Sequence, residues 1–257
     1  MSIQGNAAPA EVDSRSLPRE RGATIEISPS TRSVGYWSAA LATAFSVAYD
    51  IGQLGEWLGL MGSGGGANNP STPLGLVVLL APSLLLGSSF LLLMVSVHQL
   101  APPDRKIWSH AAVAFATAYT VLISINYFVQ LTWVVPRLAA NRTHGLEPFL
   151  FTPFDSFLYS VDILGYSFMS VATLLAARVF TGGGVARVAR RFLTANGLLL
   201  PFIALQMYVH WFIWIAALWA VTFPGSTWAL ATLFRRARAE ANARAPHLTG
   251  SPPLTSL

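Results

Sequence analysis

The chain has 257 residues, of which 53% are apolar and only 11% are charged, and it contains no cysteine. A soluble domain usually carries about 25% charged residues, so this composition excludes an ordinary soluble globular protein and a disordered chain. The missing cysteines exclude thiolate catalysis, disulfides, zinc–thiolate sites and iron–sulfur clusters. These features predict an integral membrane protein.

The first part of the chain is polar, and it mixes arginine with acidic residues without an apolar stretch. It resembles neither a cleavable signal peptide nor an acid-poor transit peptide. We expect residues 1–34 to form a disordered cytoplasmic tail and residues 237–257 to form a second one. Residues 35–236 between them are expected to form the transmembrane domain.

Long stretches with almost no charge make up this middle region, and a membrane-crossing helix needs about 20 mainly apolar residues. Five stretches qualify, namely Tyr36–Leu60, Leu74–Leu100, Ile107–Val135, Phe157–Phe180 and Phe192–Phe234. The last stretch has 43 residues, which is enough for two crossings with a break at Tyr208–Trp211. Pro224 is expected to kink the final helix. The sequence therefore predicts an all-α, polytopic transmembrane bundle of six spans.

The basic residues indicate how these spans are threaded. If both termini are cytoplasmic, fourteen of the sixteen basic residues face the cytoplasm, and only Arg137 and Arg142 face out. The positive-inside rule therefore predicts an N-in/C-in topology. The net charge of +5 is explained by topology and by anionic lipid head groups. We therefore expect the lipid bilayer, and no nucleic acid, as a partner.

The first span carries small residues at every fourth position, which are Ala40, Ala44, Ala48 and Gly52. A stripe of small side chains lets two helix backbones approach closely. It predicts close helix packing and a contact surface for a membrane partner.

Polar side chains within the spans are costly in lipid, so they are candidates for function. The ligand-binding candidates are Asp50, Gln53 and Glu56 in the first span, Asn126 and Gln130 in the third, and Asp162 in the fourth. With a rise of 1.5 Å per residue, Asp50 lies about 21 Å above the inner end of its helix. The same reasoning places the whole set in the outer half of the bilayer.

No lysine or arginine lies in the outer half of a span to pair with these acids. Asp50 and Asp162 are therefore expected to be protonated, to face water, or to hold a cationic ligand. We predict that both line one outward-opening cavity with Gln53, Asn126 and Gln130. The alternative is that Asp50 is neutral and bonded to Gln53, while Asp162 and Glu56 lie near water.

Aromatic residues gather near the third predicted loop, Leu138–Ser156. Trp133, Phe149, Phe151 and Phe154 are interpreted as part of an aromatic belt at the outer interface. The loop itself is expected to lie on the outer surface as a flap.

Motifs for catalysis and cofactor binding are missing from the sequence. It has no Walker A motif and no Gly-x-Ser-x-Gly elbow, and its histidines do not show metal-ligand spacing. We therefore expect no catalytic residues, no cofactor and no metal, and we lean away from an enzyme.

Two segments carry a resemblance to a known family. The string Asn126-Tyr127-Phe128-Val129-Gln130-Leu131-Thr132, followed by Pro136, and the string Asp162-Ile163-Leu164-Gly165-Tyr166 with Met169 resemble a group of uncharacterised bacterial multi-span membrane proteins. The resemblance covers roughly residues 35–236. It implies a six-span protein of the bacterial inner membrane and brings no activity or site residues. Only one of the sixteen basic residues is a lysine, which is typical of a GC-rich bacterial genome.

Three functions stay open on this evidence. The first is the binding or movement of a small cationic or polar ligand at a polar cavity in the outer half. The second is a non-catalytic structural or interaction subunit that packs through the small-residue stripe. The third is a membrane-embedded enzyme acting on a lipid, with Asp50 or Asp162 as acid or base.

Overall fold

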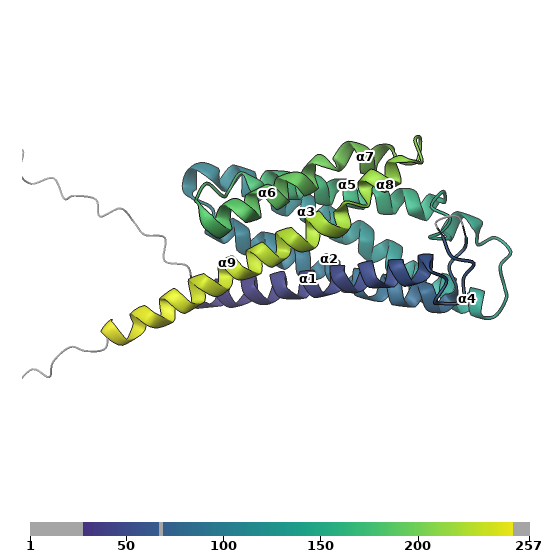
Figure 1. Ribbon diagram of the computed structural model, residues 1–257, viewed down its shortest axis with the longest axis horizontal. Helices are drawn as coiled ribbons and strands as arrows, with labels where there is room; N and C mark the ends of the chain where they lie inside the picture. The colour runs from purple at the N-terminus through teal and green to yellow at the C-terminus, as the bar shows by residue number, and fades with distance from the viewer. Residues whose placement is uncertain (1–27, 67–68, 249–257) are drawn as a thin grey trace, which may run out of the picture.

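The computed structural model describes residues 28–66 and 69–248, and it is built from helices (Figure 1). No strand occurs in this described part. The longer helices are α1 (Pro29–Trp57), α2 (Pro73–Leu100), α3 (Lys106–Val129), α5 (Phe157–Ala177), α6 (Gly184–Leu198) and α9 (Trp219–Leu248). The shorter ones are α4 (Val135–Ala139), α7 (Leu200–Leu205), α8 (Phe212–Ala216), two 3₁₀ turns (Pro103–Arg105 and Glu147–Phe149) and a π-helical turn (Gln130–Val134).

Five helical segments in the described residues are long and apolar enough to cross a membrane, judged by length and composition. They are Pro73–Leu100, Pro103–Ala139, Phe157–Ala177, Gly184–Leu205 and Phe212–Glu240. The prediction of an all-helical, multi-pass membrane protein is confirmed at this level. α1, the first predicted span, lies outside this set although it has 29 residues, because polar side chains such as Ser38, Thr43 and Asp50 recur along it.

The six long helices form a closed ring. Each packs against the next in the order α1, α2, α3, α5, α6, α9, and α9 returns to α1. Five aromatic rings fill the middle, and successive ring centroids are 5.1–5.6 Å apart all the way round. This aromatic floor consists of Phe90, Tyr119, Tyr166, Trp219 and Phe223. It closes the centre of the bundle, because aromatic rings at these separations are in contact.

The spacing between α1 and α9 follows the size of the residues between them. Gly35 lies directly against the ring of Phe234, so the backbones meet closely at that level. Further along, the hydroxyls of Thr43 and Thr227 are 2.8 Å apart. Beyond this point the partners are tyrosine and tryptophan, and the Tyr49–Trp219 centroids are 5.8 Å apart. The two helices therefore cross near the N-terminal end of α1 and diverge toward the opposite end of the bundle (Figure 1).

Both ends of the described chain lie at the same end of the bundle (Figure 1). Two connections meet there, because the Arg105 guanidinium donates a 3.1 Å hydrogen bond to the carbonyl of Arg178. Arg178 also lies 5.6 Å above the ring of Trp108. We call this end the terminal end and the other the distal end.

The first and last helices extend past both predicted domain boundaries. α1 begins at Pro29, because Ser28 caps it by accepting a hydrogen bond from the Thr31 amide and proline is favoured in the first turn. α9 continues to Leu248, because its last part is rich in alanine and arginine, which are strong helix formers. The remaining predicted tail residues lie outside the described part of the chain.

The long apolar run at 192–234 is divided as predicted, between α7 and α8. α9 runs through Pro224 without a break, and the interruption in this region lies upstream at Ala217–Leu218. The kink at Pro224 stays a prediction. A second interruption, at Leu199, separates α6 from α7 two residues before Pro201. A proline obstructs the carbonyl four residues earlier, which for Pro201 is that of Gly197, so Pro201 accounts for the break at Leu199.

The small-residue stripe of α1 does not form one contact surface. Gly52 is buried against Val78 of α2, so that end of the stripe is already occupied within the chain. Ala44 and Ala48 are exposed. The bundle instead packs through another stripe of small residues that includes Ser38, Ala39, Ala42 and Ser46. Contact with a membrane partner through Ala44 and Ala48 stays a prediction.

Candidate functional site

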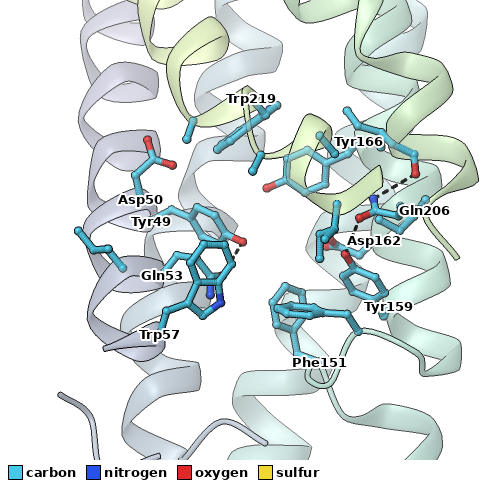
Figure 2. A pocket seen from close by; sticks show the side chains of 18 residues that line it. Tyr49, Asp50, Gln53, Trp57, Phe151, Tyr159, Asp162, Tyr166, Gln206 and Trp219 are labelled. Carbon is cyan, nitrogen blue, oxygen red and sulfur yellow. Dashed lines mark hydrogen bonds between the residues drawn. The ribbon is translucent and has the colours of Figure 1, made fainter. Parts of the chain in front are cut away.

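A cavity of about 270 Å³ lies in the distal half of the bundle. It is lined by side chains from α1, α5, α7, α8 and α9 and from the segment before α5 (Figure 2). The divergence of α1 from α9 creates this space, and the aromatic floor bounds it toward the terminal end through Tyr166 and Trp219. Its volume is slightly below the roughly 300–1,000 Å³ typical of small-molecule sites.

Phe151 and Phe154 close the distal side of the cavity. Both side chains are buried, and their rings contact each other and Tyr159, with centroids 5.1–5.7 Å apart. The interpretation of these two phenylalanines as parts of a surface belt and flap is therefore wrong. Burial of two large aromatic side chains stabilises the bundle more than an interfacial position would.

Asp162 is the most enclosed carboxylate of the cavity, with 4% of the residue exposed. α5 carries it one turn distal to Tyr166 of the floor. Its Oδ1 accepts a hydrogen bond from Asn126 Nδ2 at 3.1 Å. The one salt bridge among the described residues joins Arg105 to Asp104 near the terminal end. Within the described residues, Asp162 therefore has an amide hydrogen-bond partner, Asn126, and no basic partner.

Asp50 lies across the cavity from Asp162, on α1 (Figure 2). It is half-buried, and the described residues provide no hydrogen bond to its carboxylate. The cavity thus carries two acidic groups on facing walls. A protonated amine is attracted to such a site by both carboxylates and by the faces of the surrounding aromatic rings.

Gln53 and two aromatic neighbours continue the α1 wall. Tyr49 donates a 3.1 Å hydrogen bond to Gln53 Oε1, which fixes the amide beside the cavity. Gln53 Nε2 and the indole nitrogen of Trp57 are buried and have no partner among the described residues. An unpaired buried donor costs about 1–3 kcal/mol, so an acceptor on a bound molecule would relieve this cost.

On the opposite wall, Tyr159 and Gln206 form a second polar pair. Tyr159 donates to Gln206 Oε1 at 3.1 Å, and Gln206 Nε2 donates to the carbonyl of Ile203 at 3.0 Å (Figure 2). These groups are therefore paired within the protein. They make this wall rigid, and Asp162 is the one acidic side chain of this wall.

The other predicted site residues lie outside the cavity lining. Asn126 lies behind Asp162 and orients it. Gln130 is buried in the π-helical turn, where its Nε2 donates to the carbonyl of Phe149. This bond holds the segment that carries Phe151. Asn126 and Gln130 therefore position the cavity walls.

Glu56 is predicted as a site residue but belongs to a different contact. It is buried, with its carboxyl group against Gly75 in the first turn of α2. Neither carboxyl oxygen has a hydrogen-bond partner in the described residues. A helix N-terminus attracts negative charge, so Glu56 fits a role in joining α1 to α2.

Sequence reasoning identified the acids and missed the aromatic residues that complete the cavity. Tyr49, Gln53 and Trp57 are spaced four residues apart, so they lie along one stripe of α1. This mixed polar and aromatic stripe was the available signal. Trp219 gave no such signal, because its place depends on the break between α8 and α9.

Comparison with known proteins found no family model, no curated protein and no solved structure that matches this chain. Function is therefore argued from the chemistry of the cavity.

Proposed function

We propose that this chain is a six-span protein of a bacterial inner membrane that binds a small organic cation, a protonated amine, in the distal cavity. The observation that carries the proposal is the pairing of Asp50 and Asp162 with an aromatic lining and with no basic side chain in that lining. Carboxylates confined in this way favour a cationic partner, because an unpaired buried charge is strongly disfavoured.

Binding is favoured over conduction through the bundle. The aromatic floor lies directly beside the cavity, and Phe90, Tyr119 and Phe223 in it are fully buried. A continuous path would require these packed rings to separate. The cavity is therefore best suited to hold a molecule that enters and leaves on the distal half.

In the proposed topology, α1 is also a span, which brings the number of spans to six, and both termini lie in the cytoplasm. α1 belongs to the closed ring, so it is expected to share the membrane with its neighbours. Both described ends and the Arg105–Arg178 contact lie at the terminal end, and the positive-inside rule makes a basic end cytoplasmic.

We expect Thr143→Cys to be labelled by a membrane-impermeant maleimide in intact cells and Ser251→Cys to be labelled only after permeabilisation. The natural chain has no cysteine, so each variant reports a single position. Thr143 is exposed in the distal loop. Labelling of Ser251→Cys in intact cells would reverse the proposed topology.

The cation proposal is tested by calorimetry on the detergent-purified full chain. Benzylammonium is expected to bind at least tenfold more tightly than benzyl alcohol, which has a similar shape without the charge. Tenfold corresponds to about 1.4 kcal/mol. The double variant Asp50→Asn/Asp162→Asn should lose this preference, whereas Glu56→Gln, a buried acid outside the cavity, should keep it. Equal affinity for the amine and the alcohol in the natural chain would overturn the proposal.

A further inference from the structure

The cavity opens toward one side of the bundle. Among its lining residues, Leu54 is 57% exposed, Ala220 is also exposed, and Asp50 and Ala217 are partly exposed. These four residues face one another across the gap between α1 and the α8–α9 junction, and we call this gap the lateral window. The lining residues on α5 and α7, in contrast, are mostly buried.

Two aromatic pairs connect α1 to the α8–α9 region on either side of the window. Tyr49 and Trp219, with centroids 5.8 Å apart, lie toward the floor. Trp57 and Trp214, with centroids 5.5 Å apart, lie toward the distal end. The α8–α9 junction contributes the small side chains of Ala216, Ala217 and Ala220 to the lining. The window is therefore kept open by large residues above and below and by alanine within it.

The surface around the window is apolar. Exposed side chains on its rim are Ile51, Leu54, Leu58, Trp214, Leu218 and Val221. In the membrane, side chains at this depth meet the acyl chains of lipids. A molecule passing through the window therefore comes from, or remains attached to, the hydrocarbon phase.

The distal end of the cavity is closed to water by packing and hydrogen bonds. Phe151 is 2% exposed. The adjoining residue Thr152 accepts a 2.7 Å hydrogen bond from the Ser71 amide and donates one of 3.1 Å to the Ser71 hydroxyl. The segment is thus fixed on the N-terminal side of α2. A purely water-soluble ligand has no comparable opening at this end.

We infer that the cavity takes a single-chain amphiphile with a primary ammonium head group, and that its alkyl tail leaves through the lateral window into the bilayer. This inference rests on the proposed binding of a cation and adds the class of ligand and its route. The cavity accommodates the head group and the first part of the chain. The tail stays in an apolar environment, so it is not exposed to water on binding.

The test compares dodecylammonium with benzylammonium on purified protein in lipid nanodiscs, for the natural chain and for Ala220→Phe. The added ring should obstruct the window. Dodecylammonium is expected to lose at least tenfold in affinity, whereas benzylammonium, which fits within the cavity, should change less than about threefold. Val121→Phe is the matched control, because Val121 is an exposed residue of α3, a helix that contributes no residue to the cavity lining; it should change neither affinity.

The outcomes separate the two proposals. If benzylammonium binds and Ala220→Phe lowers both affinities equally or neither, the tail does not use the window and the inference is overturned. If no amine binds the natural chain, the proposed function itself fails. A dodecylammonium analogue with a diazirine in mid-chain gives a second measurement on the unmutated protein. Its cross-links are expected on Leu54 or Trp214, and cross-links confined to the Phe151 segment would contradict the lateral route.

Discussion

Asp162→Asn is expected to weaken benzylammonium binding at least tenfold, whereas Asp50→Asn should weaken it by less than about threefold. Both acids line the cavity, but Asp162 is 4% exposed and Asp50 is half-buried. The Asp162 carboxylate is also held in place by Asn126, whereas no described residue forms a hydrogen bond with that of Asp50, so Asp162 loses less freedom when a cation binds. The deeper carboxylate should therefore contribute more.

The asparagine replacement keeps the shape of the side chain, and its carbonyl oxygen can still accept from Asn126. Folding should consequently be preserved, which circular dichroism and the thermal midpoint would show. Asp104→Asn is the matched control, because Asp104 pairs with Arg105 near the terminal end. Equal losses of affinity for Asp162→Asn and Asp50→Asn would place the cation midway between the walls. No loss of affinity for Asp162→Asn would show that Asp162 is not part of the binding site.

The helical architecture was readable because membrane spans need long apolar runs, and four mainly apolar stretches after the first mark them plainly. The division of the last run between α7 and α8 was also predicted. The ends of α1 and α9 were not, since both continue into polar sequence. A hydrophobic scan detects where a helix lies in lipid and gives no information on how far it extends into water.

The candidate site could be predicted only in part. Depth and helix angle placed Asp50 and Gln53 on one face, and the structure puts both in the lining with Asp162. The position of Glu56 along its helix does not determine which neighbouring helix it faces. In the structure it turns toward α2 and contacts Gly75. The burial of Phe151 depends on a loop folding back between helices, and no periodicity in the sequence encodes that.

The contact surface of α1 shows a similar limit. Small residues occur on two stripes of this helix, and spacing alone cannot distinguish the stripe that packs from the one that faces outward. The choice is made by the partners, as Phe234 fits against Gly35 and Thr227 meets Thr43. Such choices depend on residues almost 200 positions away in the chain.

Gly197→Ala is expected to destabilise the bundle by about 1–3 kcal/mol, a range typical of overpacking. A Cβ at this position would lie 2.6 Å from Leu174 Cβ and 3.0 Å from the backbone oxygen of Ser170. Backbone cannot rotate away, so α6 would have to move from α5. That movement also strains the neighbouring Asn196, which donates to Thr173 at 3.1 Å and accepts from Thr222 at 3.0 Å. Loss of these buried bonds adds to the cost.

Gly87→Ala provides the matched comparison, and its effect should be neutral or stabilising. Gly87 is also buried inside a helix, but a Cβ there would meet Thr120 at 3.6 Å, an ordinary contact distance. Alanine is favoured over glycine in a helix by up to about 1 kcal/mol, so the two substitutions should shift stability in opposite directions. Thermal midpoints in one detergent measure both. A similar midpoint for the two variants would show that α5 and α6 do not pack as closely at Gly197 as the structure requires.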